Sequence, residues 1–476
     1  MDSPTTPAAT ESGDSTTRLF GSRLSVIESI RGCGLAGAHI NKEELKSILT
    51  IPDYLRTAIS VSISAKDATA GLESYRNSLN QTCNDEDPPE GPIFVFINPT
   101  SGGRLGPELK HRLLGMMGEE QVLDLSEVNP CDFIRFGLKC LDKIAELGDQ
   151  CAKETRRNVR IMVAGGDGSV GWVLGSISRL LVAERDCVPP IGIIPLGTGN
   201  DLSRTFGWGG SCPYAWRSAI KGTLLKAVNA HVLRLDRYRS HSLFLRLTKT
   251  KPSWKLLVSL PSGEVVDLPH SLRHSDEHFL HEGFEIEGKV PQSVNNYEGE
   301  FYNYFSIGMD ARVAYDFHQL RNERPSLAQN PIANKIIYSG YSCSQGWFLT
   351  HCINDPSLRG LKNIVRLHIK KRNSDEWESV PIPKSIRAIV VLNLHNYGSG
   401  RNPWGNLSAE YMERRGFVEA SVEDGLVEIF GLKQGWHASL VMVDLISAKH
   451  INQAASIRME LRGGEWKDAY MQMDGE

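Results

Sequence analysis

Three short, continuous apolar runs stand out in the first half of the chain: IFVFI at 93–97, VRIMVA at 159–164 and PPIGIIPL at 189–196. Runs of this length without polar alternation are typical of strands buried on both faces of a parallel sheet. Helix-compatible segments lie between them, at 133–154 and 170–184. The pattern therefore predicts an α/β lobe, with Rossmann-like parallel strands and connecting helices.

Each apolar run ends in a polar, glycine-rich loop: NPTSGG at 98–103, GGDGS at 165–169 and GTGND at 197–201. The carboxyl ends of parallel strands lie at one edge of a sheet, which is where open α/β sheets bind ligands. The last two loops are about 30 residues apart, the length of one βαβ unit. We therefore expect the three loops to meet around a ligand.

After about residue 230 the pattern changes to short alternating stretches separated by turn residues. Examples are KLLVSLPSGEVVDL at 255–268, IVRLHIKK at 364–371, IRAIVVLNL at 386–394 and GFVEASVEDGLVEIFGL at 416–432. Alternation with a period of two is the mark of strands that bury one face. This part of the chain is predicted to be a mainly antiparallel β domain with one or two inserted helices.

Changes in the pattern of apolar and polar residues divide the chain into four parts. Residues 1–23 are polar and rich in Ser and Thr, and we expect them to be disordered. Residues 24–92 are expected to form a helical extension that ends in the acidic, proline-rich linker CNDEDPPEGP. The α/β lobe then covers 93–230, and a β-rich accessory domain with a C-terminal return strand covers 231–476.

Charge and cysteine usage exclude several kinds of partner and site. The net charge of -3 gives no general attraction to nucleic acid, so we expect no nucleic-acid partner. The nine cysteines lack the C-x2-C spacing of zinc sites, and the N-terminus lacks a signal-peptide apolar core. The longest uncharged run is too polar to span a membrane, which takes about 20 apolar residues. We predict a cytoplasmic protein that meets membranes only at their surface.

Glycines allow backbone N–H groups to approach a phosphate with no side chain in the way, and the following helix adds its positive end. Gly165, Gly166 and Gly168 in the second loop fit this role, as do Gly197 and Gly199 in the third. The segment GDGSVG also satisfies the dinucleotide pattern G-x-G-x-x-G. A tight strand–helix turn without a ligand is the alternative for any one loop, but three such loops at one edge favour a ligand.

Asp167 decides between two kinds of phosphate ligand. Against a dinucleotide it would face the pyrophosphate directly, and the acid expected after the next strand is missing because that strand ends in PLGTG. Mg²⁺ between the carboxylate and the phosphates removes the conflict, because this ion binds one or two carboxylates together with substrate phosphates. That arrangement is typical of phosphoryl transfer from ATP. The P-loop motif GxxxxGK[ST] and the protein-kinase motifs HRD and DFG are absent from the sequence.

Seven motifs together resemble those of eukaryotic diacylglycerol kinases, and the match runs from about 93 to 476. They are FVFINPTSGG, VAGGDGSVGWV, IGIIPLGTGNDLSR, FYNYFSIGMDARVAYDFH, NLHNYGSGRNPWG, VEDGLVEIFG and MQMDGE. GGDGS alone is also similar to loops of sphingosine kinases, NAD kinases and phosphofructokinases. Without cysteine-rich lipid-binding modules, the chain resembles the short plant-type members. The resemblance implies a diacylglycerol kinase and NAD kinase-like fold, with 93–230 as the catalytic, ATP-binding domain.

The resemblance also assigns residues to the site, which would lie between the two domains. Asp167 would hold Mg²⁺ and act in catalysis, Asp474 would also contact the metal, and Asp424 in VEDGL would be the general base. The residues implied for ATP are Asn98, Gly102, Gly103, Gly165, Gly166, Gly168, Ser169, Gly197, Thr198, Gly199, Asn200 and Glu476, and Asp201 would lie near the nucleotide and the lipid head.

Simpler roles compete for three of these residues. Asp424-Gly425 is a hairpin-turn signal, Asp201 is suited to cap the helix that begins LSRTF, and Asn98-Pro99 is a good turn initiator whatever the ligand. For Asp424 the two interpretations overlap, because a turn can present a catalytic carboxylate.

The implied activity is ATP- and Mg²⁺-dependent phosphorylation of 1,2-diacylglycerol to phosphatidic acid, in lipid signalling and in stress and defence responses. We expect a monomer that visits the membrane surface, where diacylglycerol lies, without spanning it. The alternatives are a kinase for another hydroxyl, such as that of sphingosine, ceramide or NAD, and a catalytically silent nucleotide- or lipid-binding protein. A dinucleotide-dependent oxidoreductase is the most distant alternative.

Two features depart from the family pattern. Members usually continue past DGE with Pro-Trp and a further tail, whereas this chain ends at Glu476, so we expect its closing strand to be weakly anchored. Residues 237–252 resemble an extra insert that gathers basic residues beside Phe244 and Trp254. This insert is interpreted either as a patch that rests on anionic lipid or as a solvated loop.

Overall fold

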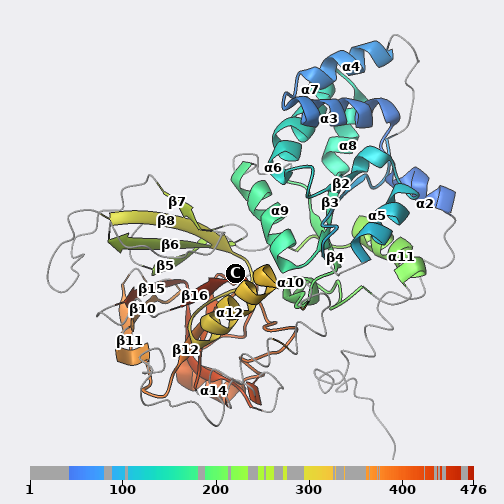
Figure 1. Cartoon of the computed structure of the whole chain (residues 1–476). Coiled ribbons are helices and arrows are strands. Elements are labelled where there is room, and N and C mark those ends of the chain that lie inside the picture. The colour runs from blue at the N-terminus through green and yellow to red at the C-terminus, as the bar shows by residue number, and fades with distance from the viewer. Residues whose placement is uncertain are drawn as a thin grey trace, which may run out of the picture.

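The computed structural model describes residues 42–79, 88–101, 105–180, 188–212, 216–233, 245–250, 253–261, 272–275, 294–324, 327, 337, 361–363, 365–372, 374, 376–422, 424–433, 437, 440, 441, 446–461 and 470–475. They form two lobes, one built from the blue to green part of the chain and one from the yellow to red part (Figure 1). No helix among these residues is long and apolar enough to cross a membrane.

The first lobe is built on a parallel sheet, as the sequence predicts. Its strand order is β2 (Val122–Asp124), β1 (Ile93–Ile97), β3 (Arg160–Gly165) and β4 (Ile191–Pro195), with every pair parallel. All five residues of β1 are buried, because helices cover both faces of the sheet. The three strands that precede the glycine loops are adjacent, so the loops emerge together at one edge.

The helices of this lobe follow the predicted order, with one interruption. They are α5 (Leu105–Leu114), η1 (Glu119–Gln121), α6 (Pro130–Asp132), η2 (Phe133–Leu138), α7 (Lys139–Glu146), α8 (Gln150–Asn158), α9 (Asp167–Leu180), α10 (Asp201–Thr205) and α11 (Trp216–Asn229). The single helix expected at 133–154 is divided, because Gly148 adopts a left-handed φ of 99° and Asp149 caps α8 by accepting from the N–H of Ala152.

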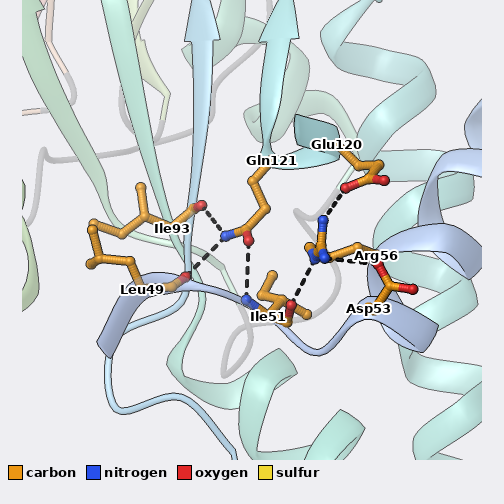
Figure 2. Close-up of polar contacts among 7 residues, drawn as sticks. All are labelled: Leu49, Ile51, Asp53, Arg56, Ile93, Glu120 and Gln121. Carbon is orange, nitrogen blue, oxygen red and sulfur yellow. Dashed lines mark hydrogen bonds and ion pairs between the residues drawn. The ribbon is translucent and has the colours of Figure 1, made fainter. Parts of the chain in front are cut away.

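The helical extension is part of this lobe rather than a separate module. It contains α2 (Lys42–Leu49), α3 (Asp53–Ala65) and α4 (Ala70–Leu79). Gln121 is fully buried beneath it: its Oε1 accepts from the N–H of Ile51, and its Nε2 donates to the carbonyls of Leu49 and Ile93 (Figure 2). One amide therefore holds both the start of β1 and the segment between α2 and α3.

An ion-paired arginine makes a second attachment of the extension. Arg56 of α3 donates to the carbonyl of Ile51 at 2.8 Å, and its guanidinium also pairs with Asp53 and Glu120 (Figure 2). The hydroxyls of Tyr54 in α3 and Tyr75 in α4 both donate to the carboxylate of Asp149. These contacts and the buried apolar face of α3 make the extension a structural layer of the α/β lobe.

The second lobe is an antiparallel β domain, also as predicted. One sheet has the order β11 (Glu378–Val380), β10 (Val365–Lys370), β15 (Ser456–Leu461), β5 (Leu245–Thr250), β6 (Ser253–Pro261), β8 (Val294–Phe301) and β7 (Arg273–His274). The other has the order β14 (Lys449–Ala454), β13 (Val427–Leu432), β12 (Ala388–Leu392), β9 (Tyr304–Gly308) and β16 (Met471–Met473). Their apolar faces share one core, and α12 (Met309–Glu323), η4 (Leu361–Asn363) and α14 (Ala409–Arg415) lie between the strands in the chain.

The region around Asp424 and the basic insert both differ from the simplest expectation. Only the second arm of the expected hairpin at 416–432 is a strand, because the N–H and carbonyl of Val418 are bonded by the side chain of Gln453 rather than by a neighbouring strand. Within the insert, residues 245–250 form β5 between β15 and β6, so this part is not a solvated loop. The expected disorder at 1–23, residues 83–87 of the linker and residues 237–244 lie outside the described residues.

Candidate active site

A side-chain hydrogen bond joins the first two glycine loops. Asn98 follows β1 directly, and its Nδ2 donates to Oγ of Ser169, in the first turn of α9, over 2.9 Å. Its Oδ1 accepts from the N–H and the hydroxyl of Thr100, and its carbonyl accepts from the N–H of Ser101. The turn predicted from Asn98-Pro99 is therefore present, and Asn98 also ties this turn to α9.

The second and third loops meet through backbone atoms that leave no room for side chains. A Cβ on Gly197 would lie 2.5 Å from Cα of Gly166, and a Cβ on Gly165 would lie 2.6 Å from Cβ of Ser169. Gly168, by contrast, is exposed, and no atom outside its own turn lies within 4 Å of its Cβ position. Packing alone thus requires glycine at 165 and 197, whereas the backbone of Gly168 faces open space.

Asn200 folds the third loop. It is buried, with a left-handed φ of 54°. Its Oδ1 accepts from the N–H of Gly197 at 2.9 Å, and its Nδ2 donates to the carbonyls of Gly197 and Gly210 at 2.7 and 2.9 Å. Its amide is thus directed to the protein backbone, and Asn200 shapes the loop that would meet a ligand.

Asp167 is the first residue of α9, and its carboxylate caps α10. Oδ2 accepts from the N–H of Asp201 at 2.9 Å, and Oδ1 accepts from the N–H of Leu202 at 3.1 Å. These N–H groups belong to the first turn of α10, where a helix offers them no internal partner. The cap that the sequence offered to Asp201 is therefore supplied by Asp167 of the preceding loop.

Asp201 instead joins the two lobes. Its carboxylate is buried, and it accepts from the N–H of Gly400 at 2.6 Å and from the N–H of Ser399 at 3.1 Å. Both donors lie in the loop after β12, where residues 398, 399 and 400 have φ values of 55°, 79° and 90°. Tyr397 and Arg401 close this loop with two backbone hydrogen bonds of 2.9 Å. The left-handed conformation turns successive N–H groups toward one anion.

Two further hydrogen bonds connect the same loop with the α/β lobe. Nδ2 of Asn396 donates to Oγ1 of Thr205 at 2.8 Å, and Oγ of Ser399 donates to the carbonyl of Thr198 at 3.4 Å. Thr198, which the sequence places near the nucleotide, therefore contacts the accessory domain through its backbone.

Three carboxylates act on one another in this region. Burial raises the pKa of Asp167 to about 7, and the charges of Asp201 and Asp474 act in the same direction, against the hydrogen bonds that Asp167 accepts. Burial also raises the pKa of Asp201, although the N–H groups of Ser399 and Gly400 favour its ionised form. The charges of Asp201 and Asp474 make ionisation of Asp167 less favourable, and a bound cation would relieve this repulsion.

Asp167 and Asp201 face one space beside Gly199. A Cβ on Gly199 would lie 3.3 Å from Oδ2 of Asp167 and 3.4 Å from Oδ2 of Asp201. Mg²⁺ binds oxygen ligands and usually takes one or two carboxylates, with phosphates and waters completing its octahedron. In the described part of the chain, no three His, Cys, Asp or Glu side chains converge as metal ligands. The two carboxylates that face this space fit Mg²⁺ whose remaining ligands are substrate phosphates and waters.

Asp474 directly follows β16, an edge strand of the accessory lobe that pairs with β9 (Figure 1). Its Oδ2 accepts from the N–H of Tyr302 at 2.8 Å, and its Oδ1 accepts from the N–H groups of Asn303 and Tyr304 at 2.8 and 3.0 Å. The charge of Asp474 contributes to the raised pKa of Asp167, so the two carboxylates interact electrostatically.

The return strand is well anchored, and the expectation of weak anchoring is wrong. β16 pairs with β9 along its whole length. Nε2 of Gln472 is buried and donates to Oδ2 of Asp310 at 2.8 Å and to Oγ of Ser306 at 3.0 Å. The same Asp310 accepts from the hydroxyl of Tyr397 at 2.6 Å, next to the loop that binds Asp201.

Comparison with known proteins agrees with this arrangement. Residues 92–232 match the diacylglycerol kinase catalytic domain, and residues 300–476 match the diacylglycerol kinase accessory domain. The chain is 58% identical to diacylglycerol kinase 4 of Arabidopsis thaliana over 470 residues, which cover 98% of this chain and 93% of that protein. The chain belongs to the diacylglycerol kinase family.

Other members of the family match this chain over different shares of their own length. Diacylglycerol kinase 7 of Arabidopsis thaliana is 57% identical over 94% of this chain and 88% of its own length. Human diacylglycerol kinase iota is 29% identical over 81% of this chain but only 29% of its own length. In each comparison the matched region therefore covers most of this chain, but it is only a minor part of the human protein.

In this diacylglycerol kinase, Asp424 lies in a turn at the boundary between the lobes. Its Oδ1 accepts from the N–H of Leu426 at 2.9 Å, and Gly425 has a φ of 81°. Val422, two residues earlier, packs against the core of the α/β lobe, and the charge of Asp424 acts on the neighbouring His395. A turn is therefore present at Asp424-Gly425, although it does not join two strands as a hairpin would, and its carboxylate acts electrostatically on His395.

Three of the predicted site residues, Gly102, Gly103 and Glu476, lie outside the described residues. No individual role follows from the sequence for four residues that make contacts between the lobes: Tyr302, Asn396, Ser399 and Gly400. These residues lie within two family motifs, FYNYFSIGMD and NLHNYGSG. The neighbouring sequence, however, does not show which residues of the other lobe they would contact.

Proposed function

We propose that this chain transfers the γ-phosphoryl group of ATP to 1,2-diacylglycerol, giving phosphatidic acid and ADP. The observation that carries the proposal is the common space beside Gly199, where two carboxylates meet glycine loops that expose backbone to a ligand. A bond forms between the lipid hydroxyl oxygen and the γ-phosphorus, and the bond from that phosphorus to the β–γ bridging oxygen breaks. This is the arrangement of carboxylates and phosphate-binding backbone that phosphoryl transfer uses.

Asp167 would hold Mg²⁺, with Asp201 facing the same ion and Asp474 adding negative charge nearby. When bound, the ion neutralises charge on the phosphate oxygens as the γ-phosphoryl group departs. The hydrogen bonds of Asp201 and Leu202 to Asp167 keep this carboxylate in place before the ion arrives. Because these bonds already exist, little reorganisation is needed when the nucleotide binds.

The glycine loops would receive the nucleotide phosphates. Gly168 leaves open space beside the first turn of α9, and N–H groups at the start of a helix stabilise anions. Gly165, Gly166 and Gly197 let the second and third loops approach each other, and Asn98 and Ser169 fix the first loop beside them. Gly102, Gly103 and Glu476 remain predicted nucleotide contacts.

Asp424 would accept the proton of the lipid hydroxyl, because an alcohol is a poor nucleophile until a base removes its proton. Its turn lies at the lobe boundary, because the nearby Val422 packs against the core of the α/β lobe. The loop that contains Ser399 also lies at this boundary, because it donates to Asp201. Replacement by asparagine keeps the size of the side chain but removes the base. We expect Asp424→Asn to lower kcat by about 10²- to 10⁴-fold while ATP still binds; a kcat within a few-fold of wild type would remove Asp424 from this role.

The substrate determines where the enzyme acts. Diacylglycerol lies within the bilayer, so the protein must bind the membrane surface from the cytoplasm, and we propose that it does so as a monomer. An apolar groove would be needed for the acyl chains, since long alkyl chains do not remain in water. Phosphatidic acid made there would act in lipid signalling, including stress and defence responses.

The deciding experiment follows labelled γ-phosphate from Mg-ATP into mixed micelles that contain diacylglycerol, ceramide or sphingosine, with NAD tested in parallel. Label in phosphatidic acid alone would support the proposal. Label in another product would reassign the substrate, and ATP binding without transfer would indicate a silent form. Omitting Mg²⁺ with excess chelator is expected to abolish the label, and transfer that persists without divalent cation would contradict the metal role.

A further inference from the structure

The turn between β8 and β9 is held by a carboxylate from the far end of the chain. The carboxylate of Asp474 accepts from three successive N–H groups, those of Tyr302, Asn303 and Tyr304. The N–H of Asp474 also donates to the carbonyl of Tyr304 at 2.9 Å. The acceptor is 170 to 172 residues away in sequence, so these three bonds form only when β16 is in place.

Asn393 completes the support of the same turn from β12. Its Nδ2 donates to the carbonyl of Tyr302 at 2.7 Å, and its N–H donates to the carbonyl of Asn303 at 2.9 Å. Every backbone donor and acceptor of residues 302 and 303 is therefore bonded. A turn bonded on both sides has one preferred position, which a catalytic interface requires.

This turn carries an accessory-domain side chain into the α/β lobe. Tyr302 is 2% exposed and belongs to the apolar core that also contains Val170 and Val173 of α9. Its ring lies along the glycine face of that helix: a Cβ on Gly171 would lie 3.6 Å from Cδ2 of Tyr302, and a Cβ on Gly175 would lie 3.3 Å from its hydroxyl. The helix against which the ring packs begins at Asp167.

We propose that Asp474 is a positioning residue. It fixes the turn that packs Tyr302 against Gly171 and Gly175. This contact sets the position of α9 relative to the accessory domain, and therefore the position of Asp167. The inference deepens the proposed kinase function, because it names what aligns the accessory domain with the phosphate loops. Asp474 acts through Tyr302 and not by touching the nucleotide.

The hydrogen bonds of Asp474 distinguish this role from that of a metal ligand. A carboxylate offers about four lone-pair sites, and three of them accept N–H groups of the turn. Asparagine at this position would replace one oxygen by an NH₂ group, which would face an N–H donor. The Asp474→Asn variant should therefore loosen the turn even when no metal or nucleotide is present.

The first measurement is hydrogen exchange of the protein without ligands, which does not depend on any activity. In Asp474→Asn we expect faster exchange at residues 302–304 and at the first turns of α9. Tyr302→Ala should increase exchange at α9 in the same way, whereas Tyr302→Phe, which keeps the ring, should stay close to wild type. Asp67→Asn is the matched control, because Asp67 accepts from the N–H and hydroxyl of Thr69 in an exposed turn far from the site.

The second measurement is kinetic and rests on diacylglycerol kinase activity. We expect kcat to fall roughly 10- to 100-fold in Asp474→Asn and in Tyr302→Ala, as small misplacements of reacting groups do. The Mg²⁺ concentration for half-maximal rate should stay within about twofold of wild type. Because both changes act through one contact, the double variant should be no worse than the worse single variant.

Several results would overturn the inference. Full recovery of kcat in Asp474→Asn at high Mg²⁺ would make Asp474 a metal ligand, and additive losses in the double variant would separate it from Tyr302. Unchanged exchange at α9 in Asp474→Asn would refute the coupling whatever the enzyme does. If wild type transfers no phosphate to diacylglycerol, the proposed function fails, yet the exchange experiment still decides the role of Asp474.

Discussion

The glycine loops of the α/β lobe and the lobe boundary opposite them are assembled in different ways. In the loops, the partners all belong to the α/β lobe: Gly165 makes room for Ser169, Gly166 touches Gly197, and Asn98 bonds Ser169 across 71 residues. At the boundary, the partners are remote, since Asp201 binds Ser399 and Gly400 across 198 and 199 residues, and Asp474 binds Tyr302 across 172. One half of the site is local, and the other half exists only after both lobes have folded.

This difference implies that the two regions contribute to catalysis in different ways. The loops supply backbone groups and carboxylates for phosphate and metal, which are chemical requirements. The boundary supplies hydrogen bonds that orient one lobe against the other. Substitutions in the first region should therefore abolish turnover, those in the second should reduce it and loosen the structure together, and those outside both should change stability alone.

The largest effect is expected at Asp167. Asp167→Asn keeps an oxygen that can accept from one N–H of α10 but removes the charge that would hold Mg²⁺. We expect kcat for phosphatidic acid to fall by at least about 10³-fold, a loss comparable to that of a key electrostatic group in other enzymes. A steady-state assay with circular dichroism of the same sample is the measurement.

Alanine at position 167 is less informative, because it also removes the cap of α10, which is typically worth about 1 kcal/mol. Asn200→Ala provides a contrast from the same lobe, since it disrupts the loop that Asn200 shapes without removing a carboxylate. Near-normal turnover by Asp167→Asn would show that the carboxylate is only a helix cap.

A smaller effect is expected at the lobe boundary. Asp201→Asn places an NH₂ group against the N–H of Ser399 or Gly400, so one hydrogen bond is lost between buried groups. We expect a loss of about 1–3 kcal/mol in the free energy of unfolding. Because Asp201 also faces the metal space, kcat should fall as well, by about 10-fold or more. Urea denaturation and kinetics of one preparation measure both.

Glu378→Gln is a suitable control for this substitution, because Glu378 pairs with Lys371 on the surface, where ion pairs contribute little. If Asp201→Asn lost activity but kept its stability, the contact of Asp201 with the accessory domain would not contribute to the stability of the fold. Its role would then be that of a metal ligand only.

The sequence predicted the local half of the molecule well, for physical reasons. Continuous apolar runs at 93–97, 159–164 and 189–196 are typical of buried strands, and glycine at their ends implies tight loops. The charge of Asp167 beside phosphate-binding glycines was enough to suggest a cation. Each of these arguments uses residues that are neighbours in the chain, so no knowledge of the other lobe was needed.

The remainder depended on contacts that neighbouring residues do not reveal. Asp201 has the residue type and position of a helix cap, yet Asp167 caps that helix and Asp201 binds the other lobe. The stretch 416–422 alternates like a strand, but Gln453 bonds the backbone of Val418 and replaces a strand partner. Such competition among distant groups is decided by tertiary packing rather than by local preference.

The α/β lobe and the accessory domain are also expected to differ in their response to pH. Burial raises the pKa of Asp167 from 3.8 to about 7, so the folded protein holds a proton that the unfolded chain releases in this window. The stability of the ligand-free protein should therefore fall as the pH rises from about 4 to about 7. Burial lowers the pKa of His450 below 6.5, so the unfolded chain takes up a proton first and stability falls as the pH drops below that value.

Thermal unfolding of the ligand-free protein from pH 5 to pH 8 tests both signs. Asp167→Asn should flatten the decline toward pH 7, and Mg-ATP should diminish it in wild type by favouring the ionised carboxylate. His450→Gln should flatten the acid side, because neutral His450 bonds the carbonyl of Trp404 and the hydroxyl of Tyr411. Equal slopes in wild type and Asp167→Asn would show that the carboxylates are not coupled as described.

The smallest effect on catalysis is expected where the helical extension joins the α/β lobe. Gln121→Ala leaves the N–H of Ile51 and the carbonyls of Leu49 and Ile93 without their buried partner (Figure 2). Each unsatisfied buried group costs about 1–3 kcal/mol, so we expect the free energy of unfolding to fall by at least about 2 kcal/mol. Well below the unfolding temperature, kcat and the KM for ATP should match wild type. Equal stability loss with a lower kcat would mean that the extension acts on the glycine loops through β1, and the local half of the site would then begin at residue 49 rather than at Asn98.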